Sequence, residues 1–356
     1  EGERERERET LLCLRWSAMA LGMGWRLLLA ASGLAPGAAL HARREPLSEC
    51  VERMRATGED AQEQARACTR LSELVTLTPE QWQKIKPSPV QAEAIDLGAD
   101  VLAVAAMGRF PNDAEVQVAC SKTLSKLAQW NAPYFDVLGQ HGAIEAMANA
   151  VQSFTDDPKM LGLSGNMAAL TDFERDPGSV KNLERLEKTG VAETVLHGMT
   201  KFRNHSEVVL TSLCFFSNAC APPKINAKMI EEGYLEDSVE IMRRSQKKFG
   251  IRGEVVWLAD KCFSDDEEKR RRQADAGLLE QVVATLQDGN VGRRTDVLNN
   301  ERMFKNAMRL LKKYALASKE YRARILEAGA EKEILTGLTK GLAKTSDACS
   351  CLAALL

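Results

Sequence analysis

The side chains of this sequence that could do chemistry are four histidines, nine cysteines and one run of four acidic residues. No H-E-x-x-H, G-x-S-x-G, phosphate-loop or G-x-G-x-x-G motif surrounds them. His141 precedes a glycine expected to end a helix and His205 falls in an expected loop, so capping or surface roles suit both better than proton transfer. The acids Asp265–Glu268 come directly before an expected helix, where carboxylates complement the positive end of the helix dipole. We therefore expect no enzyme, no cofactor, no metal and no small-molecule substrate.

Cysteine usage bears on the compartment. The chain has no C-x-x-C pair, and most cysteines fall on apolar faces of expected helices, where a free thiol behaves as a small apolar side chain. Stacked helices are not expected to bring them together in a regular set of disulfides. Reduced thiols favour a cytoplasmic location. The cysteines are Cys13, Cys50, Cys68, Cys120, Cys214, Cys220, Cys262, Cys349 and Cys351.

Overall charge is balanced, with 48 basic and 50 acidic residues. No global field therefore favours a nucleic acid or a membrane surface as partner. The basic run Lys269–Arg272 could act as a nuclear localisation signal, but it follows four acids on a short expected helix, so a solvated helix face is the better interpretation.

The elements that position these side chains repeat along the chain. Six glycines recur at intervals of 43 to 52 residues, and each closes one amphipathic segment and opens another. Glycine suits such a corner because it adopts left-handed backbone angles without a Cβ clash. A period of about 40–47 residues is typical of helical solenoids, in which no single repeat buries its own apolar face. The glycines are Gly98, Gly142, Gly190, Gly233, Gly277 and Gly329.

A third apolar-periodic stretch follows each pair of segments. Apolar residues within it fall at i, i+3, i+4 and i+7, which places one helix face against its neighbours. Loop and N-cap signals such as Pro111-Asn112-Asp113 separate these stretches. The stretches are Val116–Leu127, Met160–Leu170, Val208–Ala219, Val255–Phe263 and Met303–Tyr314.

Two kinds of segment resemble the armadillo family. Glu320–Leu335 is similar to the armadillo pattern of charged residues, an apolar pair, Glu-Ala-Gly-Ala and an apolar stripe. Ser212–Cys220 and Thr123–Ala128 resemble the family's third helix. The resemblance covers residues 46–356. It implies an all-α fold, a right-handed α-solenoid of about six armadillo-like three-helix repeats.

The resemblance also implies a site, because armadillo third helices line a concave groove. Its register places paired positions four residues apart in the groove, and the family's import carriers hold Trp and Asn there. Here only Trp257 and Asn218 match, and they belong to different repeats, so that ladder is not kept. Basic residues replace it. The expected partner-binding residues are Lys122, Lys126, Asn218, Trp257, Lys261, Arg309 and Lys313.

Like charges four residues apart destabilise a helix slightly, which an acidic ligand could offset. We therefore expect a non-catalytic scaffold that binds an extended protein segment, acidic or phosphorylated, on the third helices. One alternative is that the lysines only solvate an exposed helix face. Another is a regulatory armadillo segment of a larger multidomain protein such as a kinase. Partner, pathway and oligomeric state are beyond the sequence.

The N-terminal residues 1–45 are not expected to belong to the repeat domain. Met23 to Ala42 offers one basic residue, an apolar run and small residues, which resembles a secretory signal. An organelle transit peptide and a helix capping the solenoid are the alternatives, so a secretory or organellar location stays open beside the cytoplasmic one. No later stretch has the ~18 consecutive apolar residues of a membrane span. Asn204-His205-Ser206 is a glycosylation sequon that matters only if the chain is secreted.

Overall fold

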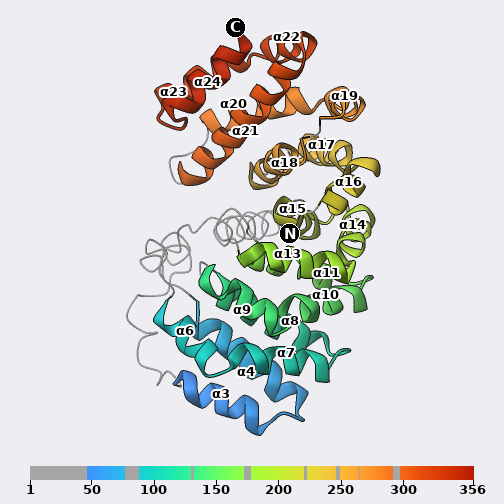
Figure 1. Cartoon of the computed structure of the whole chain (residues 1–356), viewed down its shortest axis with the longest axis vertical. Coiled ribbons are helices and arrows are strands. Elements are labelled where there is room, and N and C mark those ends of the chain that lie inside the picture. Colours follow the sequence, from blue (N-terminus) through green and yellow to red (C-terminus); the bar gives the residue numbers. More distant parts are fainter. Residues whose placement is uncertain are drawn as a thin grey trace, which may run out of the picture. The chain divides into compact units, whose positions relative to one another are not determined.

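The computed structural model describes residues 46–76, 88–129, 132–171, 178–219, 223–245, 249–263, 265–291 and 297–356. Every regular element within these ranges is a helix (Figure 1). The expected N-terminal segment 1–45 lies outside them. The described residues form two compact units, an N-terminal unit that ends at Ala219 and a C-terminal unit that follows it. Each unit is described by itself.

The N-terminal unit opens with a helix pair and continues with three triplets. The pair is α3 (Leu47–Ala56) and α4 (Ala61–Leu74). The first triplet is α6 (Pro89–Asp96), α7 (Ala99–Arg109) and α8 (Ala114–Ala128). The second is η1 (Ala132–Tyr134) with α9 (Phe135–Gln140), then α10 (Ala143–Ser153), then α11 (Pro158–Leu161), α12 (Ser164–Met167) and η2 (Ala168–Leu170). The third is α13 (Gly178–Thr189), α14 (Val191–Lys201) and α15 (Ser206–Ala219).

The C-terminal unit holds three more triplets. They are α16 (Pro223–Glu231), α17 (Tyr234–Arg244) and α18 (Phe249–Lys261); α19 (Glu267–Asp275), α20 (Leu278–Val291) and α21 (Val297–Ala317); and α22 (Lys319–Glu327), α23 (Ala330–Thr339) and α24 (Thr345–Leu355). The all-α fold of about six three-helix repeats is confirmed.

The corner between the first and second helix of each triplet is a left-handed glycine. All six glycines expected there have positive φ, from 68° at Gly190 to 92° at Gly277. This turn leaves the carbonyl before the glycine without a partner in its own helix, so another donor must satisfy it. Three corners take that donor from the preceding repeat's second helix. Arg55 donates to Leu97 O, Gln152 to Thr189 O at 3.0 Å, and Arg243 to Ala276 O.

Third helices pack against one another in a row within each unit. In the N-terminal unit α4 packs on α8, α8 on α12 and η2, and these on α15. In the C-terminal unit α18 packs on α21 and α21 on α24 (Figure 1). The cores are apolar and buried from solvent, as the 0% exposure of Leu124, Phe215, Leu258 and Leu310 shows. Because each third helix completes its neighbour's core, the repeats depend on one another for stability.

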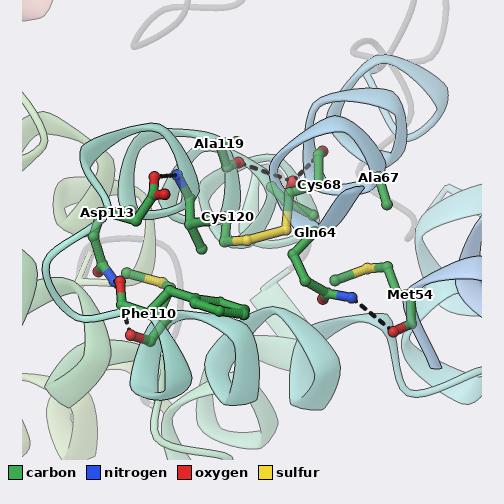
Figure 2. The surroundings of a disulfide bond; sticks show 12 residues. Met54, Gln64, Ala67, Cys68, Phe110, Asp113, Ala119 and Cys120 are labelled. Atoms are coloured by element: carbon green, nitrogen blue, oxygen red, sulfur yellow. Dashed lines mark hydrogen bonds between the residues drawn. A yellow bond between two sulfur atoms is a disulfide. The ribbon is translucent and has the colours of Figure 1, made fainter. Parts of the chain in front are cut away.

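Local sequence repeats reappear as repeated hydrogen bonds. Gln64 of α4 donates to Met54 O at 2.8 Å, at the end of α3 (Figure 2). In the same way, Gln117 of α8 donates to Met107 O at 2.8 Å, at the end of α7. Asp113 caps the start of α8 by accepting from the backbone N–H groups of residues 115 and 116. An N-terminal Asp followed four residues later by Gln thus ties each of these third helices to its second helix.

One expected helix is broken. The stretch Met160–Leu170 was expected to form one third helix, but it forms α11, α12 and the 3₁₀ turn η2 instead. Gly162 and Gly165 lie in it, and glycine lowers helix propensity by about 1 kcal/mol relative to alanine. Packing on α8 and α15 keeps these short pieces in the position of the missing helix.

A disulfide joins the first two third helices of the N-terminal unit. Cys68 of α4 and Cys120 of α8 are bonded with their Cα atoms 4.9 Å apart, and both are 0% exposed (Figure 2). The expectation that stacked helices would not bring cysteines together is wrong for this pair. Adjacent third helices pack side by side, so residues at equivalent positions of two neighbouring third helices face each other. Two cysteines at such positions, Cys68 and Cys120, are close enough to bond. Among the described residues Cys50, Cys214, Cys262 and Cys351 are buried thiols and Cys349 is an exposed one.

Candidate interaction surface

All seven predicted binding residues lie on third helices. In the N-terminal unit Lys122 and Lys126 lie on α8 and Asn218 lies on α15. In the C-terminal unit Trp257 and Lys261 lie on α18, and Arg309 and Lys313 lie on α21. The two units therefore offer separate candidate surfaces, and they differ in chemistry.

A buried carboxylate organises the C-terminal surface. Asp260 of α18 has a side chain that is 1% exposed, and its Oδ2 lies 2.5 Å from Arg309 Nε. Lys313 Nζ lies 3.0 Å from Asp260 Oδ1 and donates to Asp260 O at 2.8 Å. Asp260 is not among the residues predicted from the sequence. Its signal is an acid inside the apolar stretch Val255–Phe263, where a carboxylate needs a partner to be tolerated.

Trp257 is covered by a cation of the neighbouring third helix. The Arg302 guanidinium lies 3.5 Å from the centroid of the Trp257 ring, and Trp257 is only 5% exposed. An arginine over an indole face contributes about 0.5–2 kcal/mol, more when the pair is desolvated. The indole is therefore part of a filled contact between α18 and α21.

These contacts give α18 and α21 a parallel register, since Trp257 meets Arg302 while Asp260 meets Arg309 and Lys313. Residues 302, 309 and 313 are seven and four apart, so they share one face of α21. Arg309 and Lys313 have side chains 38% and 37% exposed. Lys261 follows Asp260 directly and is half-buried. We call Trp257, Lys261, Arg302, Arg309 and Lys313, with Asp260 beneath them, the basic face.

An aromatic cluster secures the end of α21 beside this face. Tyr314 packs edge-on against Phe263 and Tyr321, with ring centroids 5.2 and 5.3 Å apart, and its hydroxyl donates to Gln273 at 2.6 Å. Tyr321 donates to Glu267 at 2.8 Å. Burial, and then this bond to a carboxylate, raise the pKa of Tyr321 to about 12. Both tyrosines therefore stay neutral and hold α21 in place at ordinary pH.

The predicted residues of the N-terminal unit are used inside the fold. Lys126 is 8% exposed and donates to Gln129 Oε1 at 3.0 Å, while Lys122 is half-buried. Asn218 is 7% exposed and donates to Cys214 O of its own helix at 3.1 Å. Their role as binding residues stays a prediction.

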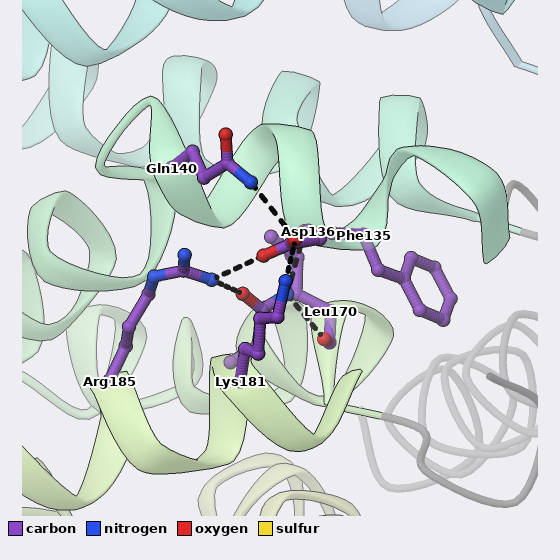
Figure 3. Close-up of polar contacts among 7 residues, drawn as sticks. Phe135, Asp136, Gln140, Leu170, Lys181 and Arg185 are labelled. Atoms are coloured by element: carbon purple, nitrogen blue, oxygen red, sulfur yellow. Dashed lines mark hydrogen bonds and ion pairs between the residues drawn. The ribbon is translucent and has the colours of Figure 1, made fainter. Parts of the chain in front are cut away.

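First helices carry a different kind of polar contact. Asp136 of α9 accepts from Lys181 of α13 at 2.7 Å, from Gln140 at 2.9 Å and from Arg185 at 3.1 Å (Figure 3). The bond from Lys181, followed by those from Arg185 and Gln140, holds the pKa of Asp136 below its usual value. Asn182 lies in the same network and donates to Phe135 O at 2.7 Å and to Leu170 O at 3.0 Å. This network ties adjacent repeats together.

The described residues contain no group of three or more His, Cys, Asp or Glu side chains placed to hold a metal ion. They also contain no helix with the length and apolar character needed to cross a membrane. One open depression lies on α23 and is lined by Glu331, Lys332, Leu335, Thr336 and Thr339.

No protein-family model and no curated protein matches the chain. Among solved structures, an engineered protein aligns with a TM-score of 0.62 and 19% identity, covering 87% of this chain and 68% of its own. That similarity shows the fold alone. A designed armadillo repeat protein aligns with a TM-score of 0.41 and 18% identity, covering 87% of this chain and 100% of its own. Another, in complex with the peptide (KR)4, aligns at 0.39 and 17%, covering 88% and 100%.

The fold assignment therefore depends on the repeat geometry. Triplets of helices, a left-handed glycine at each first corner and a row of third helices within each unit define an armadillo-like α-solenoid fold.

Proposed function

We propose that this chain is a non-catalytic scaffold, spanning residues 46–356, that binds a segment of a partner protein on its third helices. The basic face is the proposed contact in the C-terminal unit, and the segment is negatively charged. Aspartate and glutamate, or phosphorylated residues, could supply that charge.

The observation that carries the proposal is that α18 and α21 together hold four cations, two of which contact the buried carboxylate of Asp260. Arg302, Arg309 and Lys313 share one face of α21, and Lys261 lies beside Asp260. A cation stripe of this kind destabilises a helix by a few tenths of a kcal/mol per like-charged pair. Asp260 neutralises one of these four positive charges, which leaves the basic face with a net charge of +3. A negatively charged segment would balance more of that charge.

Asp260 also limits how the face can bind. Arg309 and Lys313 already contact it, so a ligand carboxylate must share them. A guanidinium has five N–H donors and an ammonium has three, and both side chains are more than a third exposed. A second acceptor can therefore be added from the solvent side while Asp260 remains bound.

The test uses the full chain and three fluorescent peptides of equal length, one rich in glutamate, one in phosphoserine and one in lysine. Binding is followed by anisotropy at two salt concentrations. We expect the two anionic peptides to bind, the lysine peptide not to bind, and binding to weaken as salt rises. Their relative affinities distinguish carboxylates from phosphates.

The variant that tests the basic face most directly is Lys261→Glu, because this change leaves the contacts of Asp260 with Arg309 and Lys313 in place. Reversing Lys313 as well should weaken binding further, but it also sets a second carboxylate beside Asp260. Lys332→Glu, at an exposed position of α23, is the matched control with the same charge change. Equal affinity of Lys261→Glu and wild type for the anionic peptides would remove the basic face as the site.

A further inference from the structure

We propose that Asn204 carries an N-linked glycan, and that the chain folds in the oxidising secretory environment in which that glycan is added. Asn204-His205-Ser206 is the only Asn-X-Ser/Thr sequence in the chain. The inference does not depend on the proposed function.

The fold exposes the acceptor. Asn204 lies in the turn between α14 and α15, just before the N-cap residue of α15, and its side chain is exposed. The equivalent residues of the other three turns of the N-terminal unit, Glu59, Asn112 and Asp156, are exposed as well. Exposure of the residue at this position of the turn is therefore a shared property of the repeats in this unit.

There is room for a glycan at this turn. Lys201, Arg203 and His205 are exposed around Asn204, and Ser206, which supplies the hydroxyl of the sequon, is the first residue of α15. Ser206 is followed by 13 further residues of α15, so about 20 Å of helix separates Asn204 from Asn218 at the other end. A glycan at Asn204 would leave that end of the third-helix row uncovered.

The start of α15 is also held less tightly than its counterparts. Asp60 and Asp113 cap α4 and α8 with bonds of 3.0–3.1 Å, and Asp157 caps α11 at 2.8 Å. His205 replaces the aspartate, and its Nδ1 accepts from Val208 N at 3.4 Å. A long bond to an imidazole nitrogen caps a helix more weakly than shorter bonds to a carboxylate do. The sequon therefore lies at the turn whose cap bond is the longest of these four.

The disulfide is the independent observation. Cys68 and Cys120 are bonded inside the same unit, and disulfides form and persist mainly in secreted proteins and the compartments that lead to them. This pair departs from the reduced thiols on which the cytoplasmic expectation was based, although the other described cysteines are thiols. The leader-like sequence at residues 23–42, outside the described residues, points the same way.

The test is expression of the full chain in cultured eukaryotic cells, followed by peptide-N-glycosidase F and gel mobility. We expect one glycan-sized increase in mobility. It should be absent in Asn204→Gln and in Ser206→Ala, and retained in Ser206→Thr, which keeps the hydroxyl. Asn112→Gln, at the equivalent exposed position, is the matched control and should keep the shift. In the unfolded chain, alkylation should modify Cys68 and Cys120 only after reduction.

A wild-type chain without a glycan on Asn204 overturns the proposal. A parallel arm with an added secretory signal locates the fault. If that arm is glycosylated, the native chain does not enter the pathway. If it enters microsomes without modification, the folded turn does not serve as an acceptor.

Discussion

The third helices of the two units occupy equivalent places in their repeats but use their polar side chains differently. In the N-terminal unit Lys126 and Asn218 are buried and bonded within their own neighbourhood, and a disulfide joins α4 to α8. In the C-terminal unit Arg309 and Lys313 are more than a third exposed around a buried Asp260. A shared repeat position thus serves stacking in one unit and surface charge in the other. The identity of the facing residue decides which.

The largest expected effect concerns the covalent tie of the N-terminal unit. The double variant Cys68→Ser/Cys120→Ser opens a loop of 52 residues, which costs about 4 kcal/mol in the chain-entropy description. Hydrogen exchange should show lost protection in α4 and α8, with the C-terminal unit unchanged. Cys262→Ser, at a buried thiol of the other unit, is the control. Equal loss of protection in both units would contradict a local effect of the disulfide.

The matching change in the C-terminal unit removes the buried charge. Asp260→Asn leaves Arg309 and Lys313 without their carboxylate. Because both cations are partly solvated, we expect a loss of about 2 kcal/mol, less than for a fully buried pair. Urea unfolding of Asp260→Asn against Asp347→Asn, a more exposed acid on α24, measures it. A neutral or stabilising result would mean that Asp260 does not organise the basic face.

Glycine corners should behave alike in both units. Gly190→Ala and Gly329→Ala have no atom within 4 Å of the added Cβ, so the penalty comes from φ values of 68° and 87°. Each should cost about 1–2 kcal/mol. Gly108→Ala, inside α7 and equally open, should instead stabilise by up to about 1 kcal/mol. Clearly different penalties at Gly190 and Gly329, measured by thermal unfolding, would show that the corners are not equivalent.

The smallest expected effect is the pH dependence of the Asp136 network. The pKa of Asp136 is lower in the fold than its usual value of 3.8, because Lys181 donates to its carboxylate. The stabilisation is therefore present above about pH 4 and is lost as pH falls through the lowered folded pKa. Asp136→Asn should reduce stability at pH 6 and should lose less than wild type on going to pH 3. The measurement is the midpoint of urea unfolding for both proteins at pH 6 and pH 3. An equal fall of the midpoint in the two proteins would contradict the prediction.

Much of the architecture could be predicted from local patterns. Gly98 to Gly329 lie at the expected corners because a positive φ is a property of one residue and its immediate neighbours. The stretch Val208–Ala219 matches α15 for a similar reason, since apolar spacing within a helix is local. The prediction of a single helix over Met160–Leu170 was wrong, because the glycines in this stretch oppose the helix that its apolar spacing predicts.

The site could be predicted only in outline. The register placed Lys261, Arg309 and Lys313 on third helices, and the structure confirms that placement. It did not give the partners of these cations. Asp260 and Arg302 take part in contacts between α18 and α21. Such contacts join residues far apart along the chain, as Asp260 and Arg309 are separated by 49 positions.

The amino-acid sequence alone determined that this protein is a repeat of helix triplets with glycine corners, since propensity, periodicity and φ preference act within a few residues. Only the tertiary structure decided that Cys68 meets Cys120, that Lys126 and Asn218 are buried, and that a carboxylate lies beneath Arg309 and Lys313. Those outcomes depend on which side chains of one third helix face those of the next. That facing is set by the stacking of whole repeats, about fifty residues apart in the chain.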